Sequence, residues 1–231
     1  MKIFKQIFFI FIFFCGIVTP FVRNGLSNLL QEKPLSEDTI ETLKRSYLLI
    51  SDYGEKYDVP KEVVLAAIGS EINRRIYINR VTDYIQNWVF SSVFCTNWLV
   101  NYLIEERSLP QNDLGLGNIS LRTAWRIIEN NKRDFPMIED KKDMVDYLLT
   151  DEGNIHIACL IIKEGETLLK DYCHNTSKVE EHAIYYSYYK QGERFYFRYK
   201  AISNLKRAPI PGGGKEILIR ISKSFNLNCY E

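Results

Sequence analysis

The chain lacks an excess of charge of either sign. Its 231 residues carry 30 Lys and Arg against 29 Asp and Glu, a formal net charge of +1 at pH 7. A nucleic-acid-binding domain normally carries a basic surplus, because the phosphate backbone dominates its affinity. Composition therefore gives no support for a nucleic-acid partner.

Residues that hold metals or cofactors are scarce. Three histidines, His156, His174 and His182, form no cluster with the cysteines, and the cysteine spacings fit no zinc pattern. Gly115 and Gly117 follow no hydrophobic strand and precede no Lys-Ser or Lys-Thr pair, so they are weak evidence for a phosphate loop. We expect neither a metal nor a cofactor.

Long hydrophobic runs are missing except near the N-terminus. Residues 1–22 place two lysines ahead of an apolar run from Ile7 to Val18, the layout of a secretory signal. The run is shorter than the roughly 20 residues of a membrane-spanning helix, and Pro20 interrupts its extension. Because no A-x-A-like cleavage site follows, an uncleaved membrane anchor is the alternative. Either reading predicts an exported protein, located in the periplasm, the cell wall or the medium.

Cysteine is also infrequent. With Cys15 assigned to the leader, four residues remain: Cys95, Cys159, Cys173 and Cys229. An even number of cysteines in an exported chain allows one or two disulfides, and the sequence does not choose among the three full pairings.

What the chain does contain is enough apolar sequence for one core. Hydrophobic residues make up 46% of the chain and charged residues 26%, which favours one domain behind a leader and a linker at residues 23–37. From residue 38 to 231 the apolar spacing is mainly helical, with helices expected over residues 38–54, 59–75, 121–130, 140–149, 154–172 and 215–224. Asp58 is a candidate N-cap for the second of these. We expect a monomer.

The helix expected over residues 59–75 carries a carboxylate on its apolar face. At about 100° per residue, Glu71 falls among apolar positions such as Val64 and Ile68. Hydrocarbon around a carboxyl group disfavours its charged form and raises its pKa toward that of a general acid. The competing interpretation pairs Glu71 with Arg74 at i+3 or with Arg75 at i+4 and assigns it no chemistry.

Three motifs follow in order: DLGLGNISLRTA at residues 113–124, an Asn-led apolar helix from Asn154, and YKQG at residues 189–192. This order resembles the lytic transglycosylase and goose-type lysozyme superfamily. There, the helix with the catalytic Glu precedes a Gly-Leu-Met-Gln-Ile loop, a Thr-Ala helix and an Ala-Tyr-Asn-x-Gly segment. The resemblance covers residues 43–199 and implies a mainly α, lysozyme-like domain with a small β element near the glycine turn.

The resemblance also implies roles for individual residues. Glu71 matches the catalytic acid, and Gly115 with Leu116 matches the Gly-Leu of the loop. Asn118 stands where the Gln would be, as a hydrogen-bonding partner for an acetamido group. Tyr189 matches the tyrosine that lines the cleft. Gly117, Leu121 and Lys190 depart from the pattern, since they replace a Met, a Pro and an Asn, and they indicate a divergent member.

In that superfamily a single Glu protonates the glycosidic oxygen and then, as a carboxylate, assists attack by the sugar's 6-hydroxyl or by water. The resemblance therefore implies cleavage between N-acetylmuramic acid and N-acetylglucosamine in peptidoglycan. Asp113, beside the glycine turn, is the second candidate for a carboxylate in the substrate site. The competing interpretation is a solvated loop residue without a role in the site. Two other hypotheses remain open: a catalytically silent wall-binding or assembly protein, which Lys190 and Gly117 allow, and an exported all-α interaction protein with a structural Glu71.

Aromatic residues concentrate in two segments. Phe90, Phe94 and Trp98 follow at i+4 spacing, which favours a shared core face, with a sugar-stacking wall or a membrane-facing surface as alternatives. Between residues 185 and 199 the density of Tyr and Phe exceeds what a core requires and suits a carbohydrate cleft.

Overall fold

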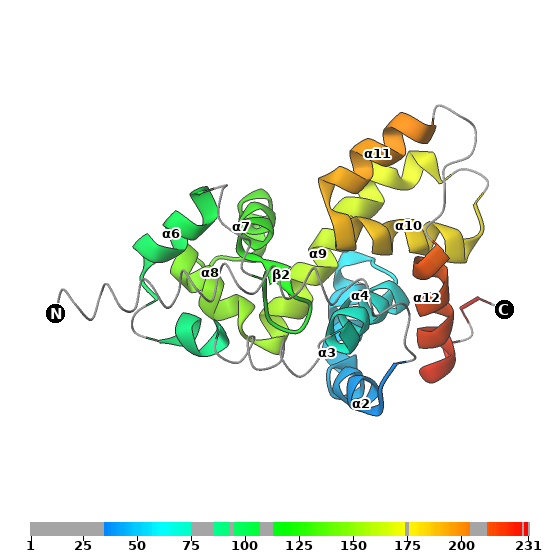
Figure 1. Cartoon of the computed structure of the whole chain (residues 1–231), viewed down its shortest axis with the longest axis horizontal. Helices are drawn as coiled ribbons and strands as arrows, with labels where there is room; N and C mark the ends of the chain where they lie inside the picture. The colour runs from blue at the N-terminus through cyan, green and yellow to red at the C-terminus, as the bar shows by residue number, and fades with distance from the viewer. Residues whose placement is uncertain are drawn as a thin grey trace.

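Helices follow one another along almost the whole described chain (Figure 1). The computed structural model describes residues 35–74, 86–92, 95–106, 113–173, 176–203, 212–227 and 229–230, so the leader and most of the linker lie outside it. The elements are α2 (Glu37–Arg45), α3 (Tyr47–Tyr57), α4 (Lys61–Arg74), α6 (Asn97–Glu105), β1 (Asp113–Leu114), β2 (Ile119–Ser120), α7 (Leu121–Asn130), η1 (Lys132–Asp134), α8 (Lys141–Leu148), α9 (Asp151–Leu169), η2 (Lys170–Tyr172), α10 (Lys178–Gln191), α11 (Glu193–Ser203) and α12 (Gly212–Ser224). The prediction of a mainly α domain with a small β element is confirmed.

Side-chain caps explain where several helices begin. The N-cap side chain accepts a hydrogen bond from a first-turn N–H in five helices, which satisfies a donor that the helix leaves unpaired. Ser120 caps α7 in this way, by accepting from the N–H of Thr123. The five capping residues are Ser36, Thr96, Ser120, Asp140 and Thr150.

Three predicted helix boundaries are wrong. The first helix is divided at Ser46 into α2 and α3. Asp58 does not cap α4, because it ends α3 in the left-handed conformation, with φ 51° and an almost fully exposed side chain. Asn154 does not begin its helix, since Thr150 caps α9 and Asn154 lies in the first turns with its side chain fully buried.

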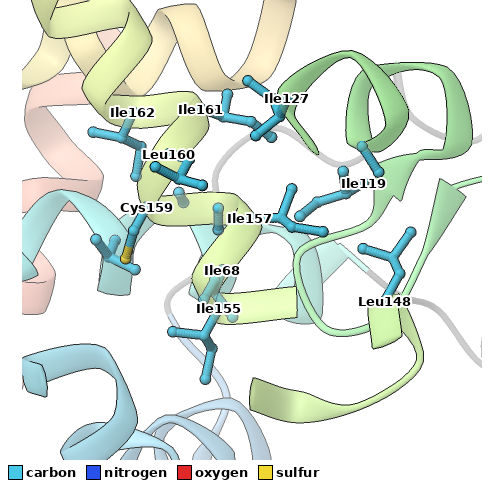
Figure 2. Close-up of a cluster of buried hydrophobic side chains, with 14 of the residues drawn as sticks. Ile68, Ile119, Ile127, Leu148, Ile155, Ile157, Cys159, Leu160, Ile161 and Ile162 are labelled. Carbon is cyan, nitrogen blue, oxygen red and sulfur yellow. The ribbon is translucent and has the colours of Figure 1, made fainter. Parts of the chain in front are cut away.

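Helix α9 joins two groups of helices. Figure 1 shows α6, α7, α8 and the β-hairpin at one end of the molecule and α2, α3, α4, α10 and α12 at the other, with α9 extending between them. Helix α9 packs against α3, α4, α7, α8 and α10, and its residues 153–162 are all buried. In Figure 2 its Ile157 lies among Ile119 of β2, Ile127 of α7 and Leu148 of α8. Over residues 153–162 this helix is therefore buried on every side.

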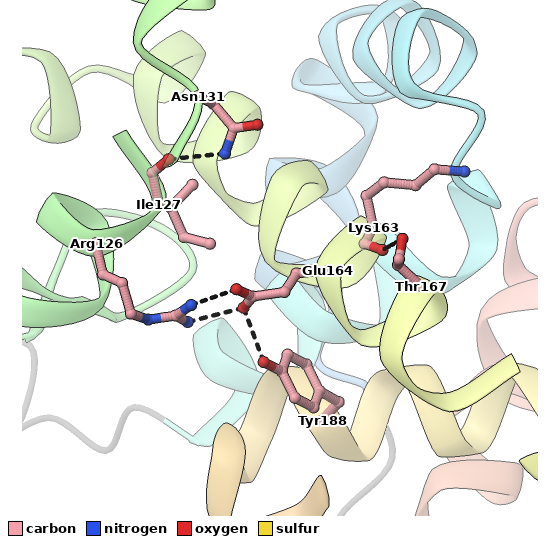
Figure 3. A network of polar contacts seen from close by, with 7 residues as sticks. All are labelled: Arg126, Ile127, Asn131, Lys163, Glu164, Thr167 and Tyr188. Carbon is pink, nitrogen blue, oxygen red and sulfur yellow. Dashed lines mark hydrogen bonds and ion pairs between the residues drawn. The ribbon is translucent and has the colours of Figure 1, made fainter. Parts of the chain in front are cut away.

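A polar contact ties the same helices together at one edge of the core. Arg126 of α7 forms a two-pronged ion pair with Glu164 of α9, and one of these contacts is 2.8 Å long. The hydroxyl of Tyr188 on α10 donates to the same carboxylate at 2.8 Å (Figure 3). One carboxylate therefore joins three helices.

The aromatic segment around residue 90 is not one continuous helical face. A short helix covers residues 86–91 and α6 begins separately at Asn97. Phe90 is buried, whereas Trp98 is 63% exposed and stacks on Tyr102 with 5.9 Å between ring centroids. The predicted shared core face therefore holds for Phe90 and fails for Trp98, while Phe94 lies outside the described residues.

The disulfides that the cysteine count allows do not form between the four described cysteines. Cys95, Cys159, Cys173 and Cys229 are all free thiols. Burial raises the pKa of Cys159 to about 12, so this thiol stays protonated and packs as a small apolar residue. No helix within the described ranges is both long enough and apolar enough to cross a membrane.

Candidate functional site

The site is built where the hairpin turn meets the last turns of α4. Glu71 lies on α4 with only 9% of its surface exposed, as its position on the apolar face of the helix predicted, but its carboxyl group faces polar partners. Asn118 ends the four-residue turn between β1 and β2, and its amide Nδ2 donates to Glu71 Oε2 at 3.2 Å. The same amide lies 3.5 Å from Asp113 Oδ2 at the start of the hairpin. The turn therefore places the amide of Asn118 between the carboxylates of Glu71 and Asp113.

The second oxygen of Glu71 faces a cation. Lys190, near the end of α10, forms an ion pair with Glu71 Oε1, and its ammonium also lies 3.4 Å from the hydroxyl of Ser70. The two paired side chains are only 14% and 11% exposed. Partial burial strengthens the attraction between these opposite charges, because less water screens them. The carboxylate is therefore held from both sides, by an ammonium and by an amide.

A fully buried asparagine fixes the glycine turn in place. Asn154 of α9 accepts from the N–H of Gly117 at 2.6 Å, and its Nδ2 donates to the carbonyls of Leu114 at 3.0 Å and Leu148 at 3.3 Å. Tyr189 of α10 donates its hydroxyl to the carbonyl of Gly117 at 2.6 Å. These bonds clamp the turn from two different helices.

The close approach of these side chains explains the two glycines. Gly115 has φ +70°, and a Cβ there would lie 2.0 Å from Asn154 Nδ2. A Cβ on Gly117 would lie 2.4 Å from the Tyr189 hydroxyl. At Gly115, both the positive φ and the close contact with Asn154 exclude a residue with a Cβ. At Gly117, the close contact with Tyr189 alone excludes it. The glycine pair is thus required by the clamp that positions Asn118.

Every candidate site residue falls in this one region. The amide of Asn118 contacts the carboxylates of both Glu71 and Asp113. The hydroxyl of Tyr189 donates to a carbonyl of the turn that carries Asn118. Gly115 and Leu116 form the first half of the turn, and the half-buried Leu116 packs against the core.

Sequence reasoning missed two contributors and underrated a third. The sequence predicts Asn154 only as the start of a helix, although a polar residue among apolar ones is a signal for a buried hydrogen-bonding role. Ser70 gave no signal of its own. Lys190 was recognised as a departure from the superfamily pattern, but its position alone did not predict the ion pair with Glu71.

The two described histidines lie in other parts of the molecule. His156 is buried against Tyr53, Tyr57 and Phe135, accepts or donates at both ring nitrogens, and has its pKa lowered by burial to about 4. Burial also lowers the pKa of His182, which lies 3.4 Å from the buried carboxylate of Glu62. Among the described residues, no group of three or more His, Cys, Asp and Glu side chains could hold a metal ion.

Comparison of the chain with protein-family models, with curated proteins and with solved structures found no match. The functional interpretation therefore depends on the motifs and on the geometry of this site.

Proposed function

We propose that the protein is a peptidoglycan-cleaving glycosidase that acts on the bond between N-acetylmuramic acid and N-acetylglucosamine, with Glu71 as its single acid and base. The observation that carries the proposal is the convergence on one shielded carboxylate of motifs far apart in sequence. Asn118 reaches Glu71 across 47 positions, and the turn that presents it is held by Tyr189, which lies 72 positions beyond Gly117. A lysozyme-like mechanism with one Glu needs a shielded carboxyl group beside the glycan, and this grouping supplies one.

The proposed chemistry follows from the position of the carboxyl group. Glu71, once protonated, gives its proton to the glycosidic oxygen, and the resulting carboxylate then takes a proton from the attacking 6-hydroxyl or water. Asn118 stabilises the carboxylate in the second step, because its amide donates to Oε2. The substrate's own acetamido group supports the positive sugar centre, so no second carboxylate is needed.

Mass analysis of digested sacculi tests this proposal. The wild-type protein should release soluble muropeptides. Anhydro ends on these products would identify a transglycosylase, and reducing ends would identify a lysozyme. Intact sacculi without any soluble product, under conditions where a known muramidase digests them, would contradict the proposal.

The ion pair at Glu71 favours a second candidate, a wall-binding protein without catalytic activity. An ammonium beside the carboxylate opposes the protonation that an acid requires. The variant Lys190→Asn restores the residue typical of the superfamily and separates the candidates. An enzyme should keep or gain activity with this change, whereas a binder should sediment with sacculi and release nothing in either form.

A further inference from the structure

Helix α6 presents an aromatic face to solvent. Its buried residues Leu99, Val100 and Ile104 lie on one side of the helix, which packs against α7 and α8. On the opposite side, Trp98 is 63% exposed and Tyr102 is 41% exposed. Single exposed apolar residues are common, but two adjacent aromatic rings form a patch of the kind that marks a binding surface.

The geometry of the two rings suits a chain of sugars. Trp98 and Tyr102 stack with 5.9 Å between their ring centroids and an angle of only 8° between their planes. Aromatic faces pack well against the apolar faces of pyranose rings. Two rings with almost the same tilt can therefore pack against one strand of sugars together.

Polar side chains beside the rings fit the same partner. Asn97 and Asn101 are half-buried on α6, and Asn101 Nδ2 donates to Asn97 Oδ1 at 3.4 Å. This contact uses one donor of the first amide and one lone pair of the second, whereas each amide has two donors and an acceptor oxygen. The hydroxyl and acetamido groups of amino sugars are suitable partners for the remaining positions.

The charges of α6 favour a glycan over a membrane surface. A helix that binds anionic lipid combines aromatic residues with Lys and Arg. Helix α6, NWLVNYLIE, contains no basic residue and one acidic residue, Glu105. Lys141 of α8 contacts Glu105 at 3.2 Å, but its side chain is only 14% exposed, so this cation is paired and largely covered. A neutral partner rich in hydroxyl groups fits this face better than an anionic lipid surface.

Helix α6 is joined to the candidate site through α7. Arg122, in the first turn of α7, donates from Nε to the carbonyl of Ile104 at 3.0 Å and from Nη2 to the carbonyl of Glu106 at 3.4 Å. Helix α7 follows directly after β2, the strand that Asn118 precedes, and Figure 1 shows α6 and the hairpin at the same end of the molecule. Tyr102 lies four residues before Glu106, about 6 Å along the helix axis. A glycan strand at Asn118 that extends over several sugars can therefore contact this face as well.

We propose that the outer face of α6, formed by Trp98 and Tyr102 with Asn97 and Asn101 beside them, is an accessory binding surface for N-acetylated sugars of the glycan strand. It binds sugars away from the bond that is cleaved, so these residues contribute to affinity and not to the chemical step. The inference rests on the proposed function, because that function supplies a glycan strand as the ligand.

Co-sedimentation with purified sacculi tests the proposal, in a Glu71→Gln background so that the strands stay intact. Adding Trp98→Ala should weaken binding about tenfold, the order expected for the loss of one well-packed ring, and Trp98→Phe should retain most of the affinity. The matched control is Phe197→Ala, because Phe197 is also 63% exposed but lies on α11, at the other end of the molecule (Figure 1). This control should bind as tightly as the background protein. Unchanged affinity in Trp98→Ala would overturn the inference.

A second measurement requires no change on α6, so it decides the matter even where Trp98→Ala fails to fold. The Glu71→Gln protein is titrated with the hexamer of N-acetylglucosamine, and the indole N–H of Trp98 is followed by NMR. Its signal should shift in a saturable manner. A signal that stays in place throughout the titration would overturn the inference.

The remaining controls separate this inference from a membrane surface and from the proposed function. Vesicles of phosphatidylglycerol and phosphatidylcholine are the membrane probe. Loss of vesicle binding in Trp98→Ala, with unchanged binding to sacculi, would assign the face to lipid and overturn the inference. If the wild type releases no muropeptides but Trp98→Ala still weakens binding to sacculi, the proposed function fails and the glycan surface stands. Release of muropeptides by the wild type, with unchanged sacculus binding in Trp98→Ala, supports the function and removes the surface.

Discussion

Removal of the Asn154 side chain should loosen the whole candidate site. In the variant Asn154→Ala, three buried groups lose their hydrogen-bond partner: the N–H of Gly117 and the carbonyls of Leu114 and Leu148. A hydrogen bond contributes about 1 kcal/mol net, and a buried group left unpaired costs about 1–3 kcal/mol. We therefore expect the free energy of unfolding to fall by about 3 kcal/mol, or by about 6–12 °C in Tm for a domain of this size.

Two companion variants show whether the hydrogen bonds, and not merely a lost side chain, account for this change. Asn154→Asp keeps the acceptor for Gly117 but turns a carboxylate oxygen toward two carbonyls, so it should destabilise at least as much as Asn154→Ala. Asn131→Ala is the control, because the side chain of half-exposed Asn131 donates a hydrogen bond to a single carbonyl, that of Ile127, at 2.7 Å (Figure 3). We expect its effect to be about 1 kcal/mol or less.

Urea unfolding followed by circular dichroism measures these differences, and amide hydrogen exchange locates them. The amide of Gly117 should exchange much faster in Asn154→Ala than in the wild type. A variant Asn154→Ala within about 0.5 kcal/mol of the wild type, with its Gly117 amide still protected, would refute the argument that Asn154 fixes the turn.

Further predictions concern the turn, a buried histidine and the contact between three helices. Gly115→Ala should cost several kcal/mol more in unfolding free energy than Gly192→Ala, because both have positive φ but only Gly115 lacks space for a Cβ, and similar losses would count against the clamp. His156 has its pKa lowered to about 4, so the stability that its neutral form provides is complete above about pH 6.5 and is lost as the pH falls toward 4. Over that interval the wild type should lose up to about 3 kcal/mol more than His156→Phe in urea titrations, and parallel losses would contradict this. Tyr188→Phe should cost about 1–2 kcal/mol because it removes one hydrogen bond to the charged Glu164, and an unchanged urea midpoint would show that this bond contributes nothing.

Local patterns in the sequence predicted those features that depend on neighbours along the chain. The helical projection put Glu71 on the apolar face of α4, and its surface is indeed 9% exposed. The helices expected over residues 121–130 and 140–149, observed as α7 and α8, likewise depend on residues within a few turns of each other. Such features follow from helix geometry alone.

Features that depend on distant partners were not predictable in this way. Asp58 carries a good N-cap side chain, but the chain turns at this residue in a left-handed conformation and uses it to end α3 instead. Phe90 and Trp98 belong to one i+4 series in the sequence, but they lie on separate helices. The packing of these helices buries Phe90 and leaves Trp98 exposed. The pairing of Lys190 with Glu71 joins residues that are far apart in sequence, and no local pattern indicates it.

The central claim is that the carboxyl group of Glu71 cleaves the glycan, and the rate at which Glu71→Gln solubilises sacculi tests it most directly. Glu62→Gln is the matched control, because Glu62 is an equally buried glutamate on α4 that faces His182 instead of the glycine turn. We predict a loss of about 100-fold or more for Glu71→Gln at unchanged folding, and a rate close to wild type for Glu62→Gln. Solubilisation by Glu71→Gln at the wild-type rate would contradict the account.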